Sequence, residues 1–425
     1  MNFLYNIGTG VYFGGIKLMS LFGHRKAKLM EEGRKDWAAR LEQQMSVLRQ
    51  EDQAKGEKRP FIWFHAASLG EFEQGRPLIE ALHDRYPHYR IIQTFFSPSG
   101  YEVRKNYKGA DVICYLPYDT KKNCRKFLDL VQPELAIFVK YEFWGNILEE
   151  LKHREIPTYL VSGIFRQRQA FFKWYGGIVR PTLGCFNHLF VQDEESRSLL
   201  SGIGVTNVTI CGDTRFDRVI AIQKAAREFP WAKTFADSAK FVLVAGSSWP
   251  KDEDILLEHF NNHPEMKLII APHEIHEEHV QGIISKLKRP YMRYSQLDEN
   301  RVAEVDCLII DAIGFLSGIY RYGQVAYIGG GFGVGIHNTL EAAVYGIPVI
   351  FGPNHQAFRE ALGLIDAKGG FPINDAADYD RYMQTFLSDT AALHAAGQQA
   401  GRYVQENSGA TEVIFSASLC FATPI

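Results

Sequence analysis

The sequence predicts an α/β protein built from two doubly wound domains. From residue 60 onward, short apolar segments with the composition of β-strands alternate with helix-forming segments, which is typical of parallel sheets covered by helices. The alternation begins again after Asp213, where residues 217–236 carry no strand pattern and are expected to link the halves. Two similar halves favour two domains that face a cleft, with ligands at the carboxyl ends of the strands.

The expected strands define the domain boundaries. In the first domain, residues 60–215, they are 61–65, 90–95, 112–115, 135–139, 158–161 and 188–191. In the second domain, residues 216–400, they are 241–245, 267–271, 305–310, 325–328 and 348–351. A C-terminal helix is expected over residues 401–425.

The composition is that of an ordinary globular protein with a large core. The 425 residues are enough for two or three domains, and 46% are hydrophobic while 23% are charged. A formal net charge of -2 gives no support for a nucleic-acid partner. The six cysteines are scattered without a C-x-x-C pair, which fits a reducing compartment and argues against a zinc or disulfide framework.

The N-terminal segment, residues 1–24, predicts an association with a membrane. Positions 3–22 are mostly apolar or small, and a basic cluster beginning at His24 follows directly. About twenty such residues can span a bilayer, with the following chain on the cytoplasmic side. Five glycines and Lys17 weaken a span, so a helix lying on the protein or on the membrane surface is the alternative. Residues 25–59 are highly charged and predict an exposed helix and linker.

The stretch Val325–Pro353 carries the strongest indication of a ligand site. An apolar strand leads into five glycines between positions 329 and 335, and Asn338 then suits a helix N-cap with Glu341 three residues later. A helix start favours an anionic group, and a carboxylate one turn in can accept hydrogen bonds from sugar hydroxyls. The pattern favours a nucleotide or nucleotide-sugar site, although its spacing is neither a dinucleotide fingerprint nor a P-loop. A loop that binds nothing, with Glu341 only a capping residue, is the alternative.

Two glutamates that follow expected strands are candidate catalytic residues. Glu71 opens a helix after the tight turn 65–70, where the helix dipole favours the charged form of a general base and burial opposes it. Glu142 follows the strand 135–139 among aromatic residues. The alternatives are that Glu71 serves only the helix dipole and that Glu142 is solvated beside an aromatic core.

Several polar groups in the second half of the chain suit phosphate binding. Arg215 could hold a phosphate in fork geometry, or it could form an ordinary salt bridge. Ser247 and Ser248 could cap a helix that starts near Pro250, or donate to a phosphate there. Residues 252–254 formally match a D-x-D metal motif, but we interpret them as first-turn helix acids, because no second acidic cluster supports a cation site.

The segment 164–181 combines basic and aromatic residues without an acid. Arg166, Arg168 and Lys173 are interleaved with five aromatic residues, which suits an anionic membrane surface or a phosphorylated lipid. Single-stranded nucleic acid would suit it as well, but nothing else in the chain supports that partner. An ordinary amphipathic helix with snorkelling basic side chains is the alternative.

These motifs together resemble the Kdo transferases, a family that moves 3-deoxy-D-manno-oct-2-ulosonic acid (Kdo) from CMP-Kdo onto a lipid A precursor. Residues 65–71 are similar to the family's H-A-x-S-x-G-E turn, which implies that Glu71 is the base for the acceptor hydroxyl. Glu142 matches a glutamate of the E-x-E-x-W-P-N-like segment, where Lys140 and Gly145 depart from the usual letters. Arg215 stands at the basic position of the G-N-x-K-F-D-like segment, with Asp213 in place of asparagine.

Four segments resemble the donor side of the family. Residues 245–248 are similar to A-G-S-T, and 338–341 fit H-N-x-L-E. Residues 271–273 resemble P-R-H without its arginine, and 313–315 resemble an M-G-E-like stretch that lacks its acid. The resemblance assigns CMP binding to Ser247, Ser248, Pro272, His273, Ile313, Gly314, Phe315, Asn338, Thr339, Leu340 and Glu341.

The resemblance implies a GT-B glycosyltransferase that inverts the sugar and needs no metal or other cofactor. Residues 60–215 would bind a phosphorylated lipid A precursor, with Arg166, Arg168 and Lys173 facing the acceptor or the membrane, and residues 216–400 would bind CMP-Kdo. The enzyme would be anchored or peripheral at the cytoplasmic face of the inner membrane of a Gram-negative cell. The alternatives are a GT-B enzyme that uses a UDP-sugar, including an epimerase, and a non-catalytic membrane-surface binding protein.

Overall fold

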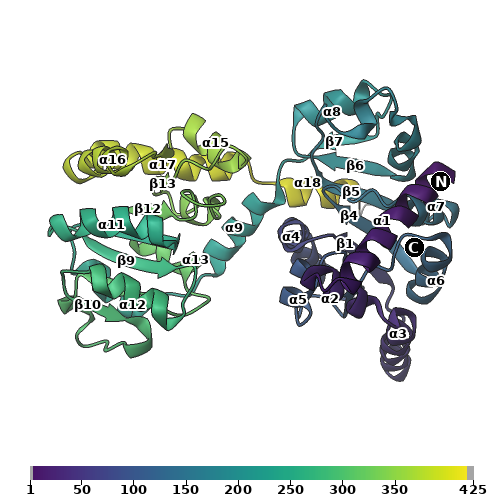
Figure 1. Cartoon of the computed structure of the whole chain (residues 1–425), viewed down its shortest axis with the longest axis horizontal. Helices are drawn as coiled ribbons and strands as arrows, with labels where there is room; N and C mark the ends of the chain where they lie inside the picture. The colour runs from purple at the N-terminus through teal and green to yellow at the C-terminus, as the bar shows by residue number, and fades with distance from the viewer. Residues whose placement is uncertain (1–2, 419–425) are drawn as a thin grey trace. The chain divides into compact units, whose positions relative to one another are not determined.

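The chain forms two compact α/β units, and a computed structural model describes residues 3–418 of it (Figure 1). The first unit contains the residues up to Asp217 together with the described residues from Gly409 on. The second unit is Arg218–Ser408. The C-terminal segment therefore returns to the first unit after the second unit is complete.

The first unit is built on a seven-stranded parallel sheet with the order β3-β2-β1-β4-β5-β6-β7. The strands are β1 (Phe61–Ala66), β2 (Arg90–Phe95), β3 (Val112–Tyr115), β4 (Pro133–Val139), β5 (Thr158–Gly163), β6 (His188–Val191) and β7 (Val208–Ile210). All six expected strands are confirmed, because buried parallel strands leave continuous apolar runs in the sequence. Strand β7 was not expected, since it is three half-buried residues at the sheet edge.

Helices follow the strands of the first sheet, and most begin at a polar cap. They are α4 (Leu69–Arg85), α5 (Pro98–Arg104), α6 (Lys121–Val131), α7 (Gly145–His153) and α8 (Glu194–Ser201). The side chains of Ser97, Thr120 and Asp193 accept hydrogen bonds from the first turns of α5, α6 and α8. Between β5 and β6 the chain forms three 3-10 turns, Ala170–Phe172, Gly176–Ile178 and Arg180–Cys185, in place of an amphipathic α-helix.

Three N-terminal helices pack on this unit: α1 (Phe3–Leu21), α2 (Arg25–Arg34) and α3 (Trp37–Ala54). Leu41 and Met45 of α3 are buried in the core, so residues 25–59 are a packed part of the unit and differ from the exposed helix and linker expected. On α1 only Phe13 and Ile16 are buried, and most of its apolar side chains are exposed. Among the described helices, none is long and apolar enough to cross a membrane.

The second unit repeats the plan with the strand order β10-β11-β9-β8-β12-β13-β14. Its strands are β8 (Val242–Ser248), β9 (Lys267–Pro272), β10 (Tyr291–Arg293), β11 (Cys307–Ile309), β12 (Val325–Ile328), β13 (Val349–Phe351) and β14 (Gly370–Pro372). Its helices are α10 (Pro230–Asp237), α11 (Pro250–Asn262), α12 (Glu277–Lys286), α13 (Leu316–Ile319), α14 (Leu340–Ala343), α15 (Arg359–Asp366), α16 (Ala376–Ser388) and α17 (Thr390–Glu406), while α9 (Thr214–Ala225) contains the unit boundary. The five expected strands are confirmed, and the two edge strands β10 and β14 were not expected.

Each sheet has a topological switch point near its centre. In the first sheet β1 has β2 on one side and β4 on the other, and in the second sheet β8 has β9 on one side and β12 on the other. Ligands of doubly wound sheets bind where connections from two such neighbours diverge, outside the carboxyl ends of the strands. Functional residues are therefore expected directly after β1, β4, β8 and β12. Glu71, Glu142 and the glycine loop lie at these positions.

The last described helix, α18 (Ala410–Ser418), is docked on the first unit. The Asp217 carboxylate accepts the N–H groups of Gly409 and Thr411 at 2.5 and 2.6 Å, and Ile414 lies in the core beside the first sheet. The expected single helix over 401–425 is thus divided, because Gly409 adopts a positive φ of 105° between α17 and α18. Residues 419–425 of that expectation lie outside the described residues.

We expect Ile414→Ala to destabilise the protein by about 2–5 kcal/mol, because it leaves a cavity where a 1% exposed side chain fills the core. Val413→Ala is the matched control on the same helix, since Val413 is 36% exposed. The measurement is the midpoint of urea unfolding. Equal effects of the two variants would contradict the docking of α18.

Candidate active site

Glu71 lies in the first turn of α4, directly after β1 and at the switch point of the first sheet. Its Oε2 accepts the N–H of Ala67 at 2.7 Å and the N–H of Ser68 at 3.1 Å, so it closes a capping box on α4. The capping role proposed as an alternative is therefore real. It does not exclude chemistry, because the side chain is only half-buried.

Glu142 lies in the loop after β4 and is 6% exposed. Its Oε2 is 2.9 Å from His65 Nε2 and accepts the indole N–H of Trp144 at 2.5 Å. His65 is in β1, next to β4 in the sheet, which explains how a residue 77 positions away reaches it. The structure therefore brings Glu142 out of solvent and into a hydrogen-bonded pair, contrary to the alternative of a solvated side chain.

The charge of Glu142 affects the pKa of Glu71. Burial, and next the charge of Glu142, raise the pKa of Glu71 from its ordinary 4.5 to about 7. The N–H groups of Ala67 and Ser68 and the charge of Lys140 oppose the rise. Burial and repulsion outweigh the helix dipole, so Glu71 titrates close to neutral pH, which suits a group that must accept a proton.

Arg215 is engaged by its neighbour Asp213. The guanidinium donates twice to Asp213 Oδ2, at 2.9 Å from Nε and 2.8 Å from Nη2, and Gln74 donates to the same oxygen. The salt-bridge alternative is therefore present in the structure. The pair fixes the orientation of a side chain that remains partly exposed.

The basic–aromatic segment divides into a buried and an exposed part. Phe165 and Phe171 pack with Phe143 in the core of the first unit. Arg166 lies 3.4 Å from Glu195, and Lys173 is half-buried. The exposed side chains of the segment include Arg168, Trp174 and Tyr175, of which Trp174 is 94% exposed.

In the second unit, the carboxyl ends of β8, β9 and β12 bring three rings together. Trp249 stacks on His273 at 4.8 Å, and His273 stacks on His337 at 4.4 Å. The Trp249 indole N–H donates to His337 Nε2 at 3.1 Å, and burial lowers the pKa of His337 to about 4, so its ring is neutral at pH 7. Sequence reasoning included His273 in the donor site but gave no role to Trp249, whose only signal was its place directly after the serine pair.

The two serines of the β8 loop differ in what their side chains can do. Ser248 is fully buried and donates to Glu253 Oε1 at 2.9 Å, so its hydroxyl is not placed for a phosphate and does not cap α11. The helix is capped instead by Asp252, which accepts the N–H of Trp249. Ser247 has a positive φ of 52°, which turns the chain sharply at the end of the strand.

Asp252 also fixes the glycine loop. Its Oδ2 accepts the N–H of Gly330 at 2.9 Å, and its Oδ1 accepts the hydroxyl of Tyr327 at 2.7 Å. The interpretation of residues 252–254 as first-turn acids is confirmed for Asp252 and Glu253, which lie in the first turn of α11.

The loop approaches β8 so closely that a Cβ on Gly329 would lie 2.2 Å from the Ser247 carbonyl oxygen. Glycine is required there by the close approach.

The Asn338–Glu341 motif is a side-chain pair at the start of a short helix. Helix α14 spans only Leu340–Ala343 and has Thr339 at its N-cap, so the expected N-cap at Asn338 is wrong by one residue. Asn338 Oδ1 accepts the N–H of Leu340 at 3.1 Å, and its amide donates to Glu341 Oε1 at 3.0 Å. Thr339 and Leu340 are buried, which leaves Asn338 and Glu341 as the half-buried members of the motif.

Of the segments predicted to bind the donor, Ile313–Phe315 has the fewest features of a binding site. Ile313 is 87% exposed, and Gly314 has a positive φ of 97°. Phe315 packs in an aromatic cluster with Phe229 and Tyr294 at 5.4 and 4.4 Å. The ring that replaces the family's acid therefore has a packing role.

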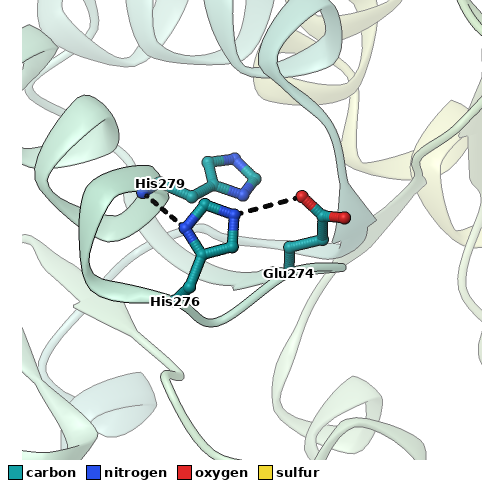
Figure 2. A group of neighbouring side chains, drawn as sticks. All are labelled: Glu274, His276 and His279. Atoms are coloured by element: carbon teal, nitrogen blue, oxygen red, sulfur yellow. Dashed lines mark hydrogen bonds and ion pairs between the residues drawn. The ribbon is translucent and has the colours of Figure 1, made fainter.

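One group of side chains in the described residues has the spacing of metal ligands. Atoms of Glu274, His276 and His279 lie within 4.8 Å of one another (Figure 2). His276 Nδ1 accepts the N–H of His279 as the N-cap of α12, which leaves its proton on Nε2, 3.2 Å from Glu274. A metal at Nε2 would have to displace that proton and break the cap.

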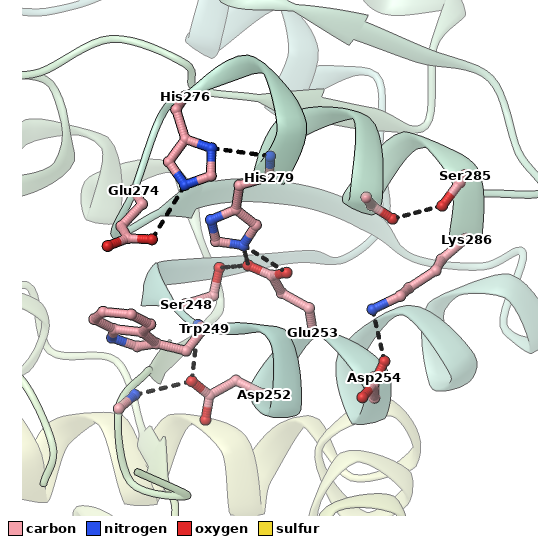
Figure 3. A network of polar contacts seen from close by, with 12 residues as sticks. Ser248, Trp249, Asp252, Glu253, Asp254, Glu274, His276, His279, Ser285 and Lys286 are labelled. Carbon is pink, nitrogen blue, oxygen red and sulfur yellow. Dashed lines mark hydrogen bonds and ion pairs between the residues drawn. The ribbon is translucent and has the colours of Figure 1, made fainter. Parts of the chain in front are cut away.

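His279 itself is paired with a carboxylate. Its Nε2 lies 2.9 and 3.0 Å from the two oxygens of Glu253, which also accepts the Ser248 hydroxyl (Figure 3). The group is therefore organised as a helix cap and a buried histidine–glutamate pair, and we assign it no metal role.

Comparison with known proteins places this geometry in a family. Residues 35–218 match the model of the 3-deoxy-D-manno-octulosonic-acid transferases (kdotransferases). A 3-deoxy-D-manno-octulosonic acid transferase of Chlamydia trachomatis serovar D is 30% identical over 315 residues, which cover 70% of this chain and 71% of the relative. The chain belongs to the Kdo transferase family. A Kdo transferase of Haemophilus influenzae is 26% identical over 366 residues, covering 83% of this chain and 84% of the relative.

Solved structures establish the fold class of this Kdo transferase family member. The UDP-GlcNAc 2-epimerase of Neisseria meningitidis, solved with UDP-GlcNAc, matches 84% of this chain and 99% of its own, with a TM-score of 0.57 and 14% identity. The expected GT-B fold class, with two doubly wound α/β units, is confirmed. The protein is a glycosyltransferase by family, and Kdo transfer is the family's activity.

We expect Glu71→Gln to be more stable than the wild type at pH 8. The gain in stability should be smaller at pH 4.5. A carboxyl whose pKa is about 7 when folded and near 4.5 when unfolded binds more protons in the folded state, so stability falls as pH rises between these values. Glutamine keeps the capping geometry without the charge. The measurement is the difference in Tm between the two proteins across this range, and a difference independent of pH would contradict the raised pKa.

Proposed function

We propose that the protein transfers Kdo from CMP-Kdo to a phosphorylated lipid A precursor, with inversion at the sugar and without a metal ion. The observation that carries the proposal is Glu71 at the carboxyl end of β1, held by two N–H groups and brought to a pKa of about 7 beside Glu142. This arrangement occurs in a chain of the Kdo transferase family. With this pKa, Glu71 is partly ionised at neutral pH and is still basic enough to accept the proton of a hydroxyl.

In the proposed reaction a hydroxyl oxygen of the acceptor attacks the anomeric carbon of Kdo from the face opposite CMP. The bond from that carbon to the phosphate oxygen breaks, and its electron pair leaves with CMP. Glu71 takes the proton of the attacking hydroxyl. CMP carries one phosphate and is a stable leaving group, so fixed N–H donors and a guanidinium can stabilise the departing charge in place of a cation.

The donor is assigned to the second unit. Asn338 and Glu341 present an amide and a carboxylate that suit ribose hydroxyls. His273 and Trp249 present flat rings beside His337, which directly precedes Asn338 in the chain. The phosphate is assigned to N–H groups at the end of β8. Arg215 of the first unit, whose orientation Asp213 fixes, is kept as a proposed catalytic residue. Ser248 is left out of this set, because its hydroxyl is committed to Glu253.

The place of action is proposed to be the cytoplasmic face of the inner membrane, where a lipid A precursor would be met. Helix α1 exposes apolar side chains along most of its length. In the segment 164–181, the aromatic Trp174 and the basic Arg168 are both exposed. Exposed aromatic and basic side chains suit a surface of anionic headgroups. The proposal is surface attachment through these two features.

We expect Glu71→Gln to abolish transfer while CMP binding is kept, and Glu341→Ala to weaken CMP binding. The first change removes the proton acceptor, whereas the second removes a carboxylate placed for ribose. Transfer is measured with labelled CMP-Kdo, and binding by the thermal shift with CMP.

UMP and UDP are the comparison ligands in the binding experiment. A larger shift with UDP than with CMP would favour a UDP-sugar enzyme and contradict the proposed donor. Near-normal turnover of Glu71→Gln would contradict the assignment of the base.

We expect the triple variant Arg168→Glu, Lys173→Glu, Trp174→Ala to lose most binding to anionic vesicles, because it reverses the charge and removes the exposed ring. Arg166→Glu should have a smaller effect, since that guanidinium already faces Glu195. Arg301→Glu, which changes an exposed arginine of the second unit, is the control. Co-sedimentation is the measurement, and unchanged binding of the triple variant would remove this surface from the proposal.

A further inference from the structure

The carboxylate of Glu142 is held from two sides at a single oxygen. His65 Nε2 lies 2.9 Å from Oε2, and the Trp144 indole N–H donates to the same oxygen at 2.5 Å. Glu142 is 6% exposed and His65 is fully buried, so water cannot replace either partner easily. A buried carboxylate keeps its charge only where donors compensate for lost hydration.

A chain of buried groups behind His65 determines which of its nitrogens carries the proton. The Trp63 indole can only donate, and it donates to Thr94 Oγ1 at 2.8 Å. Thr94 Oγ1 lies 2.8 Å from His65 Nδ1 and 3.3 Å from the Phe64 carbonyl oxygen, so its own proton is best directed at Nδ1. With Nδ1 accepting from Thr94, the imidazole carries a proton on Nε2, aimed at Glu142.

The second donor is fixed by the N-terminal helix. The Trp144 ring packs against Phe96 at 4.5 Å and stacks with Phe13 of α1 at 6.1 Å. Directly after it, the Gly145 N–H donates to the Tyr5 hydroxyl at 2.6 Å. The segment that carries Glu142 is therefore attached to α1, so this helix contributes to the site in addition to any contact with lipid.

We propose that His65 and Trp144 are positioning residues that hold the Glu142 carboxylate beside Glu71, with Thr94 and Trp63 supporting His65 and α1 supporting Trp144. The inference rests on the proposed function of Glu71 as the base. Neither residue is assigned contact with a substrate. Their role is to keep a negative charge at a fixed place next to the base.

The charged groups around the pair determine how the site responds to pH. Glu71 is affected by Glu142, which raises its pKa, and by Lys140, which lowers it. Glu142 faces His65 from β1 and Tyr12 from α1, and its charge helps to raise the pKa of Tyr12, which burial raises most. Loss of a donor to Glu142 releases that carboxylate from its fixed place next to Glu71. One of the two causes that raise the pKa of Glu71 is then weakened, and Glu71 ionises at a lower pH.

The test compares His65→Leu and Trp144→Phe with the wild-type full-length protein, using CMP-Kdo and a lipid A precursor. We expect kcat to fall about 10- to 100-fold, the effect of losing a hydrogen bond to a charged group, with little change in either KM. The acidic limb of the kcat/KM profile should move to lower pH. His65→Gln should restore much of the rate, because its amide can both accept from Thr94 and donate to Glu142.

Trp37→Phe is the control for shortening a tryptophan, since Trp37 packs near Phe127 in the same unit. A lower kcat with an unmoved acidic limb in both variants would indicate a structural role and overturn the proposal, as would unchanged kinetics. If the wild type shows no transfer, the proposed function fails, and the positioning is decided by stability. The Tm difference between His65→Leu and the double variant His65→Leu/Glu71→Gln reports the ionisation of Glu71 when the His65 donor is missing. This difference should appear at a lower pH than the Tm difference between the wild type and Glu71→Gln. Coincident pH profiles would overturn the positioning role.

Discussion

The chemistry of the first unit depends on the repulsion between the Glu71 and Glu142 carboxylates at the switch point of the sheet. The repulsion is effective because β1 and β4 are neighbours and Glu142 is excluded from water. Two donors keep Glu142 at this place, while two backbone N–H groups keep Glu71 on the first turn of α4. Burial, and next the charge of Glu142, raise the pKa of Glu71 to about 7.

In the second unit, two backbone segments approach each other closely. The end of β8 and the glycine loop after β12 are so near that no side chain fits at Gly329, and Asp252 joins the two loops through Trp249 and Gly330. The glycine at position 329 lets the two backbone segments approach without a side chain between them. The two units share the doubly wound topology but differ at their switch points. The first has a carboxylate that titrates near neutral pH, and the second has closely packed backbone with aromatic and histidine rings.

Much of the fold could be predicted from the sequence because buried parallel strands are continuous apolar runs, and eleven of them were expected. The three missed strands lie at the edges of the sheets, and most of their residues are not fully buried, so they leave no long apolar run. Motif letters identified Glu71 and Glu142, but pairing of His65 with Glu142 depends on strand order and joins positions 77 apart. Likewise, the sequence could not show that Ser248 is occupied by Glu253.

The most direct measurement of the central claim is the product of the reaction. The purified protein is incubated with a lipid A precursor and CMP-Kdo generated in situ, and the lipid is analysed by mass spectrometry. The predicted result is a lipid whose mass has increased by one or more Kdo residues, together with released CMP. An unchanged lipid in the presence of intact CMP-Kdo, or a lipid modified only when a UDP-sugar is supplied, would contradict the proposed function.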